Sequence, residues 1–443
     1  MTGASQIWVK LRRRVERLAR EYFYNKYVLR TICHAALACE LLIGGGGALR
    51  AADEGTVQLL KRTTGASNNF TDAPTPEAQQ WMSDHFWRMV VFSPYFDTRT
   101  RWYPSGWIYI DSYAIYVQPP SWMPNLAAAH PDWILHDAAG KPLYIPWGCD
   151  AAGGCPQYAA DFSNPDFRQW WIGNVQAQLA RGAYRGVWID DVNMDFRVGD
   201  SKGNAVTPVN RLTGAPMDET TWRNAFAGFM EQVRSGLPSI EIAHNAIWYA
   251  GGSARQSDPN VSREILASDL INIEHGVNDG GLTGGTGQWS LRALLAYVDA
   301  VHREGRSVIL GDAGGDTPTG PSLEYALACY FLISTGSDAI GDGGFAGPDN
   351  WWAGFDEALG AAAGPRYDWQ GLMRRDFDDG IALVREPGAT SVTVQLPVAY
   401  TRLDGSVATS VTLGSSEGAV LRRSPRRPPP ARRPAGALPI APR

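Results

Sequence analysis

The chain is poor in histidine and cysteine, with seven and five among its 443 residues. No two histidines stand four residues apart and no Cys-x-x-Cys pair occurs, so the common zinc-binding spacings are missing. No Walker loop, dinucleotide fingerprint or Gly-x-Ser-x-Gly elbow lies between a strand pattern and a helix pattern. No run reaches 18 apolar residues, which argues against a stable membrane span. We therefore expect neither a metal nor another cofactor.

Charged residues are a small share of the chain and are unevenly distributed along it. Charged residues make up 19% of the chain and the formal net charge is −5. Residues 1–50 carry +6 and residues 422–443 carry +7, so the residues between them carry −18. An acidic centre argues against a nucleic-acid groove, because such a groove neutralises phosphates with basic side chains. The Pro/Arg-rich tail, residues 424–443, is typical of disorder.

Two features bear on location. Residues 10–30 are rich in basic side chains and an apolar run covers 31–43. This order is typical of a secretory signal, despite Glu40 within the run. Cys149 and Cys155 bracket a glycine-rich loop and could close a small disulfide in an oxidising compartment. We expect a secreted or periplasmic protein, with a cytoplasmic location left open.

Beyond residue 85, short apolar strands alternate with amphipathic helices, which predicts a parallel sheet. The length suits a (β/α)8 barrel better than a doubly wound sheet, since no glycine-rich turn follows the first strand. We assign 1–84 to a signal and linker, 85–362 to the barrel, and 363–423 to a small antiparallel, β-sandwich-like domain. The eight expected strands are 87–92, 107–111, 157–161, 186–190, 240–245, 270–274, 307–312 and 337–342.

The expected strands end in polar residues. The fourth ends in the adjacent acids Asp190 and Asp191, with Asn193 close behind. In a barrel all strand ends meet at one mouth, where carboxylates can bind sugar hydroxyls or act as acid, base or nucleophile. Tryptophans in the inferred loops suit the faces of sugar rings. The expected substrate-binding residues are Asp111, Asp161, Asn193, His244, Asn245, His275, Asp312, Asp342, Trp147 and Trp248.

Three segments carry a resemblance to a known family. Gly186-Val-Trp-Ile-Asp-Asp191 resembles the fourth strand of the α-galactosidase superfamily of retaining glycoside hydrolases. The segments 130–142 and 161–170 resemble the stretch before the third strand of those enzymes, and that strand's end with the following helix. Residues 85–420 are most similar to the hypothetical glycosyl hydrolase family 15. The resemblance implies hydrolysis of an oligo- or polysaccharide.

By the same resemblance, Asp190 takes the position of the nucleophile and Glu274, at the end of the sixth strand, that of the acid/base. Asp191 stays an alternative nucleophile, since only one of two neighbours in a strand can aim into the mouth. Two carboxylates are what glycoside cleavage requires, and a retaining outcome is expected. Two other classes stay open: a non-catalytic barrel that binds polysaccharide, and a metal-dependent polysaccharide deacetylase.

Overall fold

The structure, a computed structural model, describes residues 52–62, 73–117, 123, 125–149, 154–246, 257–311, 313, 318–342 and 346–423. All described residues belong to one compact unit, Leu49–Arg443. The expected signal, the Pro/Arg tail, Trp248 and Asp312 lie outside the described residues. Among the described helices, none is long and apolar enough to cross a membrane.

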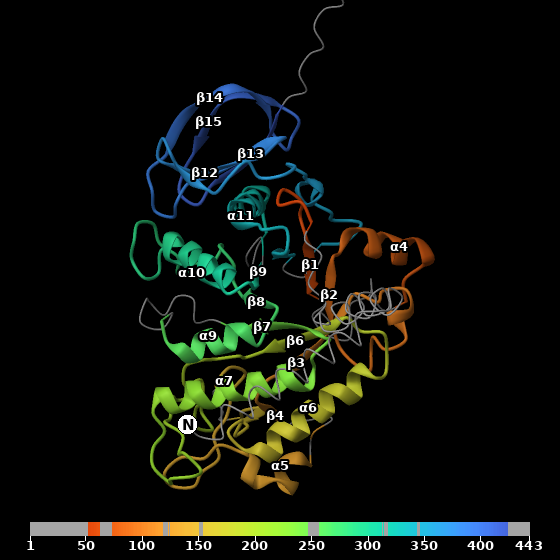
Figure 1. Ribbon diagram of the computed structural model, residues 1–443, viewed down its shortest axis with the longest axis vertical. Helices are drawn as coiled ribbons and strands as arrows, with labels where there is room; N and C mark the ends of the chain where they lie inside the picture. Colours follow the sequence, from red (N-terminus) through yellow and green to blue (C-terminus); the bar gives the residue numbers. More distant parts are fainter. Residues whose placement is uncertain are drawn as a thin grey trace, which may run out of the picture. The chain divides into compact units, whose positions relative to one another are not determined.

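The core of the fold is a closed barrel of eight strands, and every neighbouring pair is parallel (Figure 1). The expected barrel is therefore confirmed, and Asp190 ends its fourth strand along the chain. The barrel strands are β1 (Leu59–Arg62), β2 (Arg88–Val91), β3 (Gly106–Asp111), β6 (Gly186–Asp190), β7 (Glu241–Asn245), β8 (Leu270–Ile273), β9 (Ser307–Leu310) and β10 (Ala339–Gly341).

One expected barrel strand is wrong. Residues 157–161 contain β5 (Gln157–Ala159), which pairs antiparallel with β4 (Ala114–Tyr116) outside the barrel. The missing strand is β1, so the barrel begins before residue 85. Lys61 interrupts the apolar pattern of β1, yet its ammonium is buried against Asp342 at 2.9 Å. Because Lys61 is charged, β1 does not read as an apolar run in the sequence, although Lys61 is buried through its ion pair with the residue that follows the last strand.

Helices follow the strands and begin at side-chain caps. Asn164, Asp218, Ser290 and Thr319 each accept a hydrogen bond from an amide in the first turn of their helix, which satisfies an otherwise unpaired donor. The helices are α4 (Pro76–His85), α5 (Leu126–Ala129), α6 (Pro165–Leu179), α7 (Glu219–Gly236), α9 (Pro259–Leu266), α10 (Leu291–Arg303) and α11 (Gly320–Ile333), with 3-10 turns η1 (Arg99–Arg101), η2 (Pro131–Trp133) and η3 (Ala353–Asp356).

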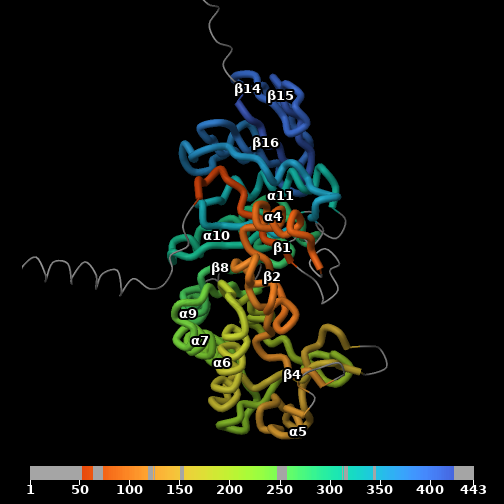
Figure 2. The backbone as a smooth tube through the Cα atoms, turned by 90° about the vertical axis from the view of Figure 1, so that its right-hand side faces the viewer, coloured from red at the N-terminus to blue at the C-terminus, as the bar shows by residue number. Residues whose placement is uncertain are grey.

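The expected C-terminal antiparallel sheet is confirmed. Its six strands follow the order β11-β12-β13-β16-β14-β15. Helix α11 is buried from Tyr325 to Ile333 because the barrel covers one side and β12, β13 and β16 cover another. Figure 2 shows β16 between the β14–β15 pair and α11. The strands are β11 (Tyr367–Trp369), β12 (Leu372–Asp376), β13 (Gly380–Val384), β14 (Val392–Thr401), β15 (Val407–Leu413) and β16 (Gly418–Arg423).

Alternation along the barrel strands decides which side chains reach the mouth. The barrel interior holds one buried cluster, which comprises Leu60, Val90, Trp107, Trp188, Ala243, Leu270, Ile309 and Ala339. Residues two positions further along each strand point to the same side, one layer closer to the carboxyl ends. On β3, β6, β7 and β8 these residues are Tyr109, Asp190, Asn245 and Asn272. The candidate site therefore stands directly on the barrel core.

Candidate active site

Asp190 lies at the centre of the site, half-buried and surrounded by donors. The Tyr109 hydroxyl donates to its Oδ2 at 2.6 Å, and the Asn245 amide donates to its Oδ1 at 2.8 Å. The backbone amide of Asp191 also donates to Oδ1, at 2.9 Å. Three donors on a carboxylate fix its orientation and suit its ionised form. Burial, and then the charges of Asp190 and Asp111, raise the pKa of Tyr109, so its hydroxyl stays protonated.

Two asparagines link the strands beneath the mouth. Asn272 on β8 donates its amide hydrogen to the side-chain oxygen of Asn245, 2.7 Å away. This bond leaves the Asn245 NH2 group facing Asp190. Because Asn245 and Asn272 are register partners in neighbouring strands, the backbone ladder sets this contact. Sequence analysis missed Asn272, although alternation from Glu274 points to it.

Glu274 follows β8 directly and is half-buried. It lines a small hollow together with Asn272, Arg62 and Trp188. The Trp188 ring forms the floor, with Tyr109 stacked at 5.6 Å and the Arg62 guanidinium 5.0 Å from its centroid. The proposed pair of acids therefore belongs to one mouth: Asp190 stands one layer above Trp188 on the same strand, and Glu274 borders the hollow over it. Arg62 and Tyr109 are further mouth residues that sequence analysis missed.

Asp191 and Asp111 form a second, more buried pair of acids. Asp191 has a φ of 56°, in the left-handed region, so it leaves the strand and turns its carboxyl toward Asp111. Asp111 also accepts the backbone amides of Tyr113 and Ala114, both at 2.8 Å. Burial, with the neighbouring carboxyls, raises the pKa of Asp191 and of Asp111. Two neighbouring buried carboxyls repel each other when both are ionised, so this arrangement favours the protonated form of one of them.

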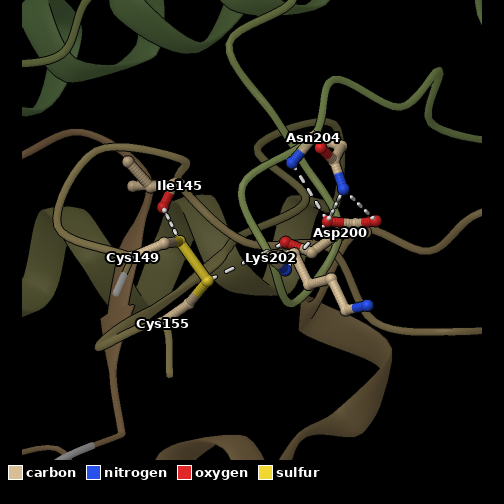
Figure 3. Close-up of a disulfide and its surroundings, with 6 residues drawn as sticks. All are labelled: Ile145, Cys149, Cys155, Asp200, Lys202 and Asn204. Carbon is tan, nitrogen blue, oxygen red and sulfur yellow. Dashed lines mark hydrogen bonds between the residues drawn. A yellow bond between two sulfur atoms is a disulfide. The ribbon is translucent and has the colours of Figure 1, made fainter. Parts of the chain in front are cut away.

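Trp147 reaches the site from the excursion after β3. Its indole N–H donates to Asp191 Oδ2 at 3.0 Å, while the side chain stays 38% exposed. The expected disulfide joins Cys149, two residues further on, to Cys155 (Figure 3). The sulfur of Cys155 lies 3.8 Å from the carbonyl oxygen of Asp200, in the loop that follows the Asp191 turn. The bridge thus ties the Trp147 loop beside the site.

Asn193 also belongs to this group. Its side-chain amide donates to Asp191 Oδ1 at 3.4 Å. It is almost fully buried, so it supports Asp191 from below. His275 is exposed on the turn after β8.

Three expected site residues are held elsewhere. His244 is fully buried and bonds Glu264 on α9, because alternation sends it outward from β7. Asp342 is also fully buried: Lys61 Nζ donates to its Oδ2, and the backbone amides of Arg62 and Ala346 donate to its two oxygens. Asp161 follows β5 outside the barrel, where Ser163 N and Arg211 engage it at 3.0 Å and 3.4 Å. These three side chains support the fold.

Within the described part of the chain, no group of three or more His, Cys, Asp or Glu side chains could hold a metal ion. The chemistry that the described mouth offers is that of carboxyl groups, a phenol, amides and a guanidinium.

The fold and the site together define a class of protein: closed (β/α)8 barrels that carry carboxyl groups at the ends of their strands. Within that class, the model of the hypothetical glycosyl hydrolase family 15 matches residues 95–381. The chain belongs to this family. A search of curated proteins finds no match.

Solved structures with a similar chain path are more distant. The glycoside hydrolase domain of PelA from Pseudomonas aeruginosa is 11% identical, with a TM-score of 0.39 over 66% of this chain and 97% of that domain. The GH36 α-galactosidase AgaA from Geobacillus stearothermophilus is 12% identical, with a TM-score of 0.40 over 84% of this chain and 56% of its own. The maltogenic α-amylase AmyB from Thermotoga neapolitana is 9% identical, with a TM-score of 0.44 over 83% and 98%. Such values carry no inference about substrate.

Proposed function

We propose that the chain is a glycoside hydrolase that cleaves O-glycosidic bonds of an oligo- or polysaccharide, with Asp190 as nucleophile and Glu274 as general acid and base. Membership of a glycosyl hydrolase family supports the class of reaction. The observation that carries the assignment is the inward position of Asp190, held by Tyr109 and Asn245 at the end of the fourth barrel strand.

Asp190 suits the nucleophile better than Asp191 does. A nucleophilic carboxylate must be ionised and aimed at the anomeric carbon. The Tyr109 hydroxyl, the Asn245 amide and the Asp191 backbone amide all donate to Asp190. Asp191 instead has a raised pKa, first because of burial and then because of the charges of Asp111 and Asp190. In the proposed reaction Glu274 protonates the leaving oxygen, a glycosyl ester forms on Asp190, and Glu274 then activates the water that hydrolyses this ester. Asp191, Asp111 and Trp147 line the mouth and bind hydroxyl groups.

The test is a glycoside panel assayed with the full chain and with Asp190→Asn, Glu274→Gln and Asp191→Asn. We expect the first two variants to lose at least about a thousandfold in kcat, and the third to lose far less. Asp84→Asn serves as the control, because Asp84 is exposed at the end of α4. NMR of the first-formed anomer reports retention or inversion. A 2-fluoro glycoside of the cleaved sugar should label the peptide at Asp190.

Two outcomes would overturn the proposal. If Asp190→Asn and Glu274→Gln both cleave as the parent does, the assignment of these acids is wrong. If no glycoside is cleaved but glycans bind, the chain is a carbohydrate-binding barrel. We further propose that the protein works in an oxidising compartment outside the cytoplasm, which the Cys149–Cys155 bridge supports. Recovery of the protein only from the cytoplasmic fraction would contradict this location.

A further inference from the structure

A cavity of about 450 Å³ lies between the barrel side of the chain and the C-terminal sheet. The first turn of α11, the turn η3, the β14–β15 turn and the β15–β16 connection supply its walls. Its volume lies within the range of small-ligand sites. The residues that matter for its chemistry are Trp352, Arg402, Glu324, Asp404 and Glu417.

Trp352 is held in one position. A side-chain carbon on Gly354 would come within 2.3 Å of the Trp352 ring, so the ring rests directly on the glycine backbone. Phe355 meets the same ring edge-on, with centroids 5.1 Å apart at 87°. A ring fixed before the ligand arrives loses little entropy on binding. An indole of this kind can stack on the C–H face of a sugar and offer its N–H to a hydroxyl.

The polar groups of the cavity are acceptors held by the backbone, beside one cation. Glu324 accepts the amide of Val420 at 3.0 Å, and Asp404 accepts that of Ser406 at 2.8 Å. Glu417 accepts the amide of Gly414 at 2.6 Å. Each carboxylate keeps lone pairs for further donors, and the Arg402 guanidinium supplies donors. Three acids against one arginine repel an anionic ligand, whereas a neutral polyhydroxyl compound can use both kinds of group.

We propose that this cavity is a second carbohydrate site, which binds a neutral oligosaccharide and carries out no bond cleavage. Helix α11 follows β9, so its first turn, which lines the cavity, lies on the carboxyl-end side of the barrel, where the mouth also lies. A polysaccharide bound at the cavity is thereby kept near the mouth, which raises the effective concentration of bonds to be cleaved. The binding itself does not depend on the proposed hydrolase function.

The test measures binding in the Asp190→Asn background, so that cleavage cannot interfere. The probes are neutral hexasaccharides of glucose, galactose and mannose, titrated by calorimetry. We expect at least one probe to bind, and Trp352→Ala to weaken that binding about tenfold. Arg402→Ala should weaken it as well, and Thr412→Trp should block it by filling the cavity. These two variants keep the test decisive if Trp352→Ala unfolds.

The matched control is Arg303→Ala, since Arg303 is exposed in the last turn of α10, outside the lining of the cavity. It should bind the probe as the background protein does. In the parent background, with Asp190 intact, a cavity variant that cleaves a small aryl glycoside normally but acts more slowly on polymer would show that the cavity serves long substrates. The proposal is overturned if no probe binds, or if all three cavity variants bind like the Arg303→Ala control. Neither result bears on Asp190 and Glu274.

Discussion

The side-chain amide of Asn272 donates to the side-chain oxygen of Asn245 and so decides which end of Asn245 faces Asp190. A freely rotating Asn245 could present its oxygen to Asp190 instead, which would place two acceptors in contact. The β7–β8 ladder sets the first of these contacts, so the orientation of the proposed nucleophile depends on strand register. Asn272 is therefore a positioning residue.

We expect Asn272→Ala to lower kcat about ten- to a hundredfold, because Asp190 loses its fixed donor while its charge is unchanged. Asn245→Ala should lower kcat by a similar factor. Since the two side chains act through one contact, the double variant should be no worse than the more damaging single variant. Steady-state kinetics on the best glycoside of the panel measure all three. Fully additive losses would show that Asn272 acts on its own.

The Asp191–Asp111 pair predicts an unusual pH dependence of stability. The pKa of Asp191 is raised in the folded protein, first by burial and then by the charges of Asp111 and Asp190. Below the unfolded-state pKa of about 4, folded and unfolded chains both hold the proton. Above it only the folded chain does, so the free energy of unfolding falls as the pH rises toward the folded value.

Asp191→Asn removes this titration and can keep the hydrogen bond from Trp147, because the amide oxygen still accepts while the side chain no longer brings a charge close to Asp111. The variant should exceed the parent in stability by about 1–3 kcal/mol at pH 8, with the difference disappearing near pH 4. Thermal unfolding across this pH range tests it. The exposed Asp84→Asn variant should show no such crossing. Greater stability of the parent at pH 8 would mean that the pair is ionised and supported in another way.

Side chains alternate between the inside and the outside of each barrel strand. This alternation separates inward-facing from outward-facing residues that the strand-end pattern had grouped together as site residues. Because Ala243 points into the barrel core, Asn245 does too, and His244 must face the surrounding helices. The same rule favours Asp190 over Asp191 on β6, given Trp188 in the core. The barrel itself was predictable because β6, β8 and β9 are short, mainly apolar strands that follow charged residues and alternate with helices.

Other features depend on contacts distant in sequence. Lys61 reads as a surface residue until its pairing with Asp342, 281 positions away, closes the barrel. Residues 157–161 look like a barrel strand, and only their pairing with Ala114–Tyr116 shows otherwise. The left-handed backbone of Asp191 and its contact with Asp111 arise from a turn that no local pattern specifies. Tyr109 and Asn272 reach the mouth because they face inward one layer above Trp107 and Leu270, an arrangement that the closure of the barrel sets.

His244 supplies a prediction about stability without catalysis. It and Glu264 are both fully buried and bonded to each other. His244→Ala leaves a buried acid without this partner, so we expect a loss of about 3–5 kcal/mol in the free energy of unfolding. Urea unfolding measures it. The double variant His244→Leu/Glu264→Leu should recover part of the loss. At a temperature where His244→Ala is folded, its kcat should stay within about twofold of that of the parent. A large fall in kcat would show that His244 takes part in catalysis.

The Cys149–Cys155 bridge connects stability to the site through Trp147. The two cysteines are six positions apart, and a loop of this length predicts a loss of about 2 kcal/mol when Cys149→Ser/Cys155→Ser replaces the bridge. The loop that carries Trp147 then loosens, and its hydrogen bond to Asp191 weakens. We therefore expect kcat to fall several-fold at temperatures well below unfolding. A reductant should reproduce both effects in the parent and change nothing in the double variant. A parent that loses stability on reduction but keeps its full kcat would show that the bridge supports the fold without positioning Trp147.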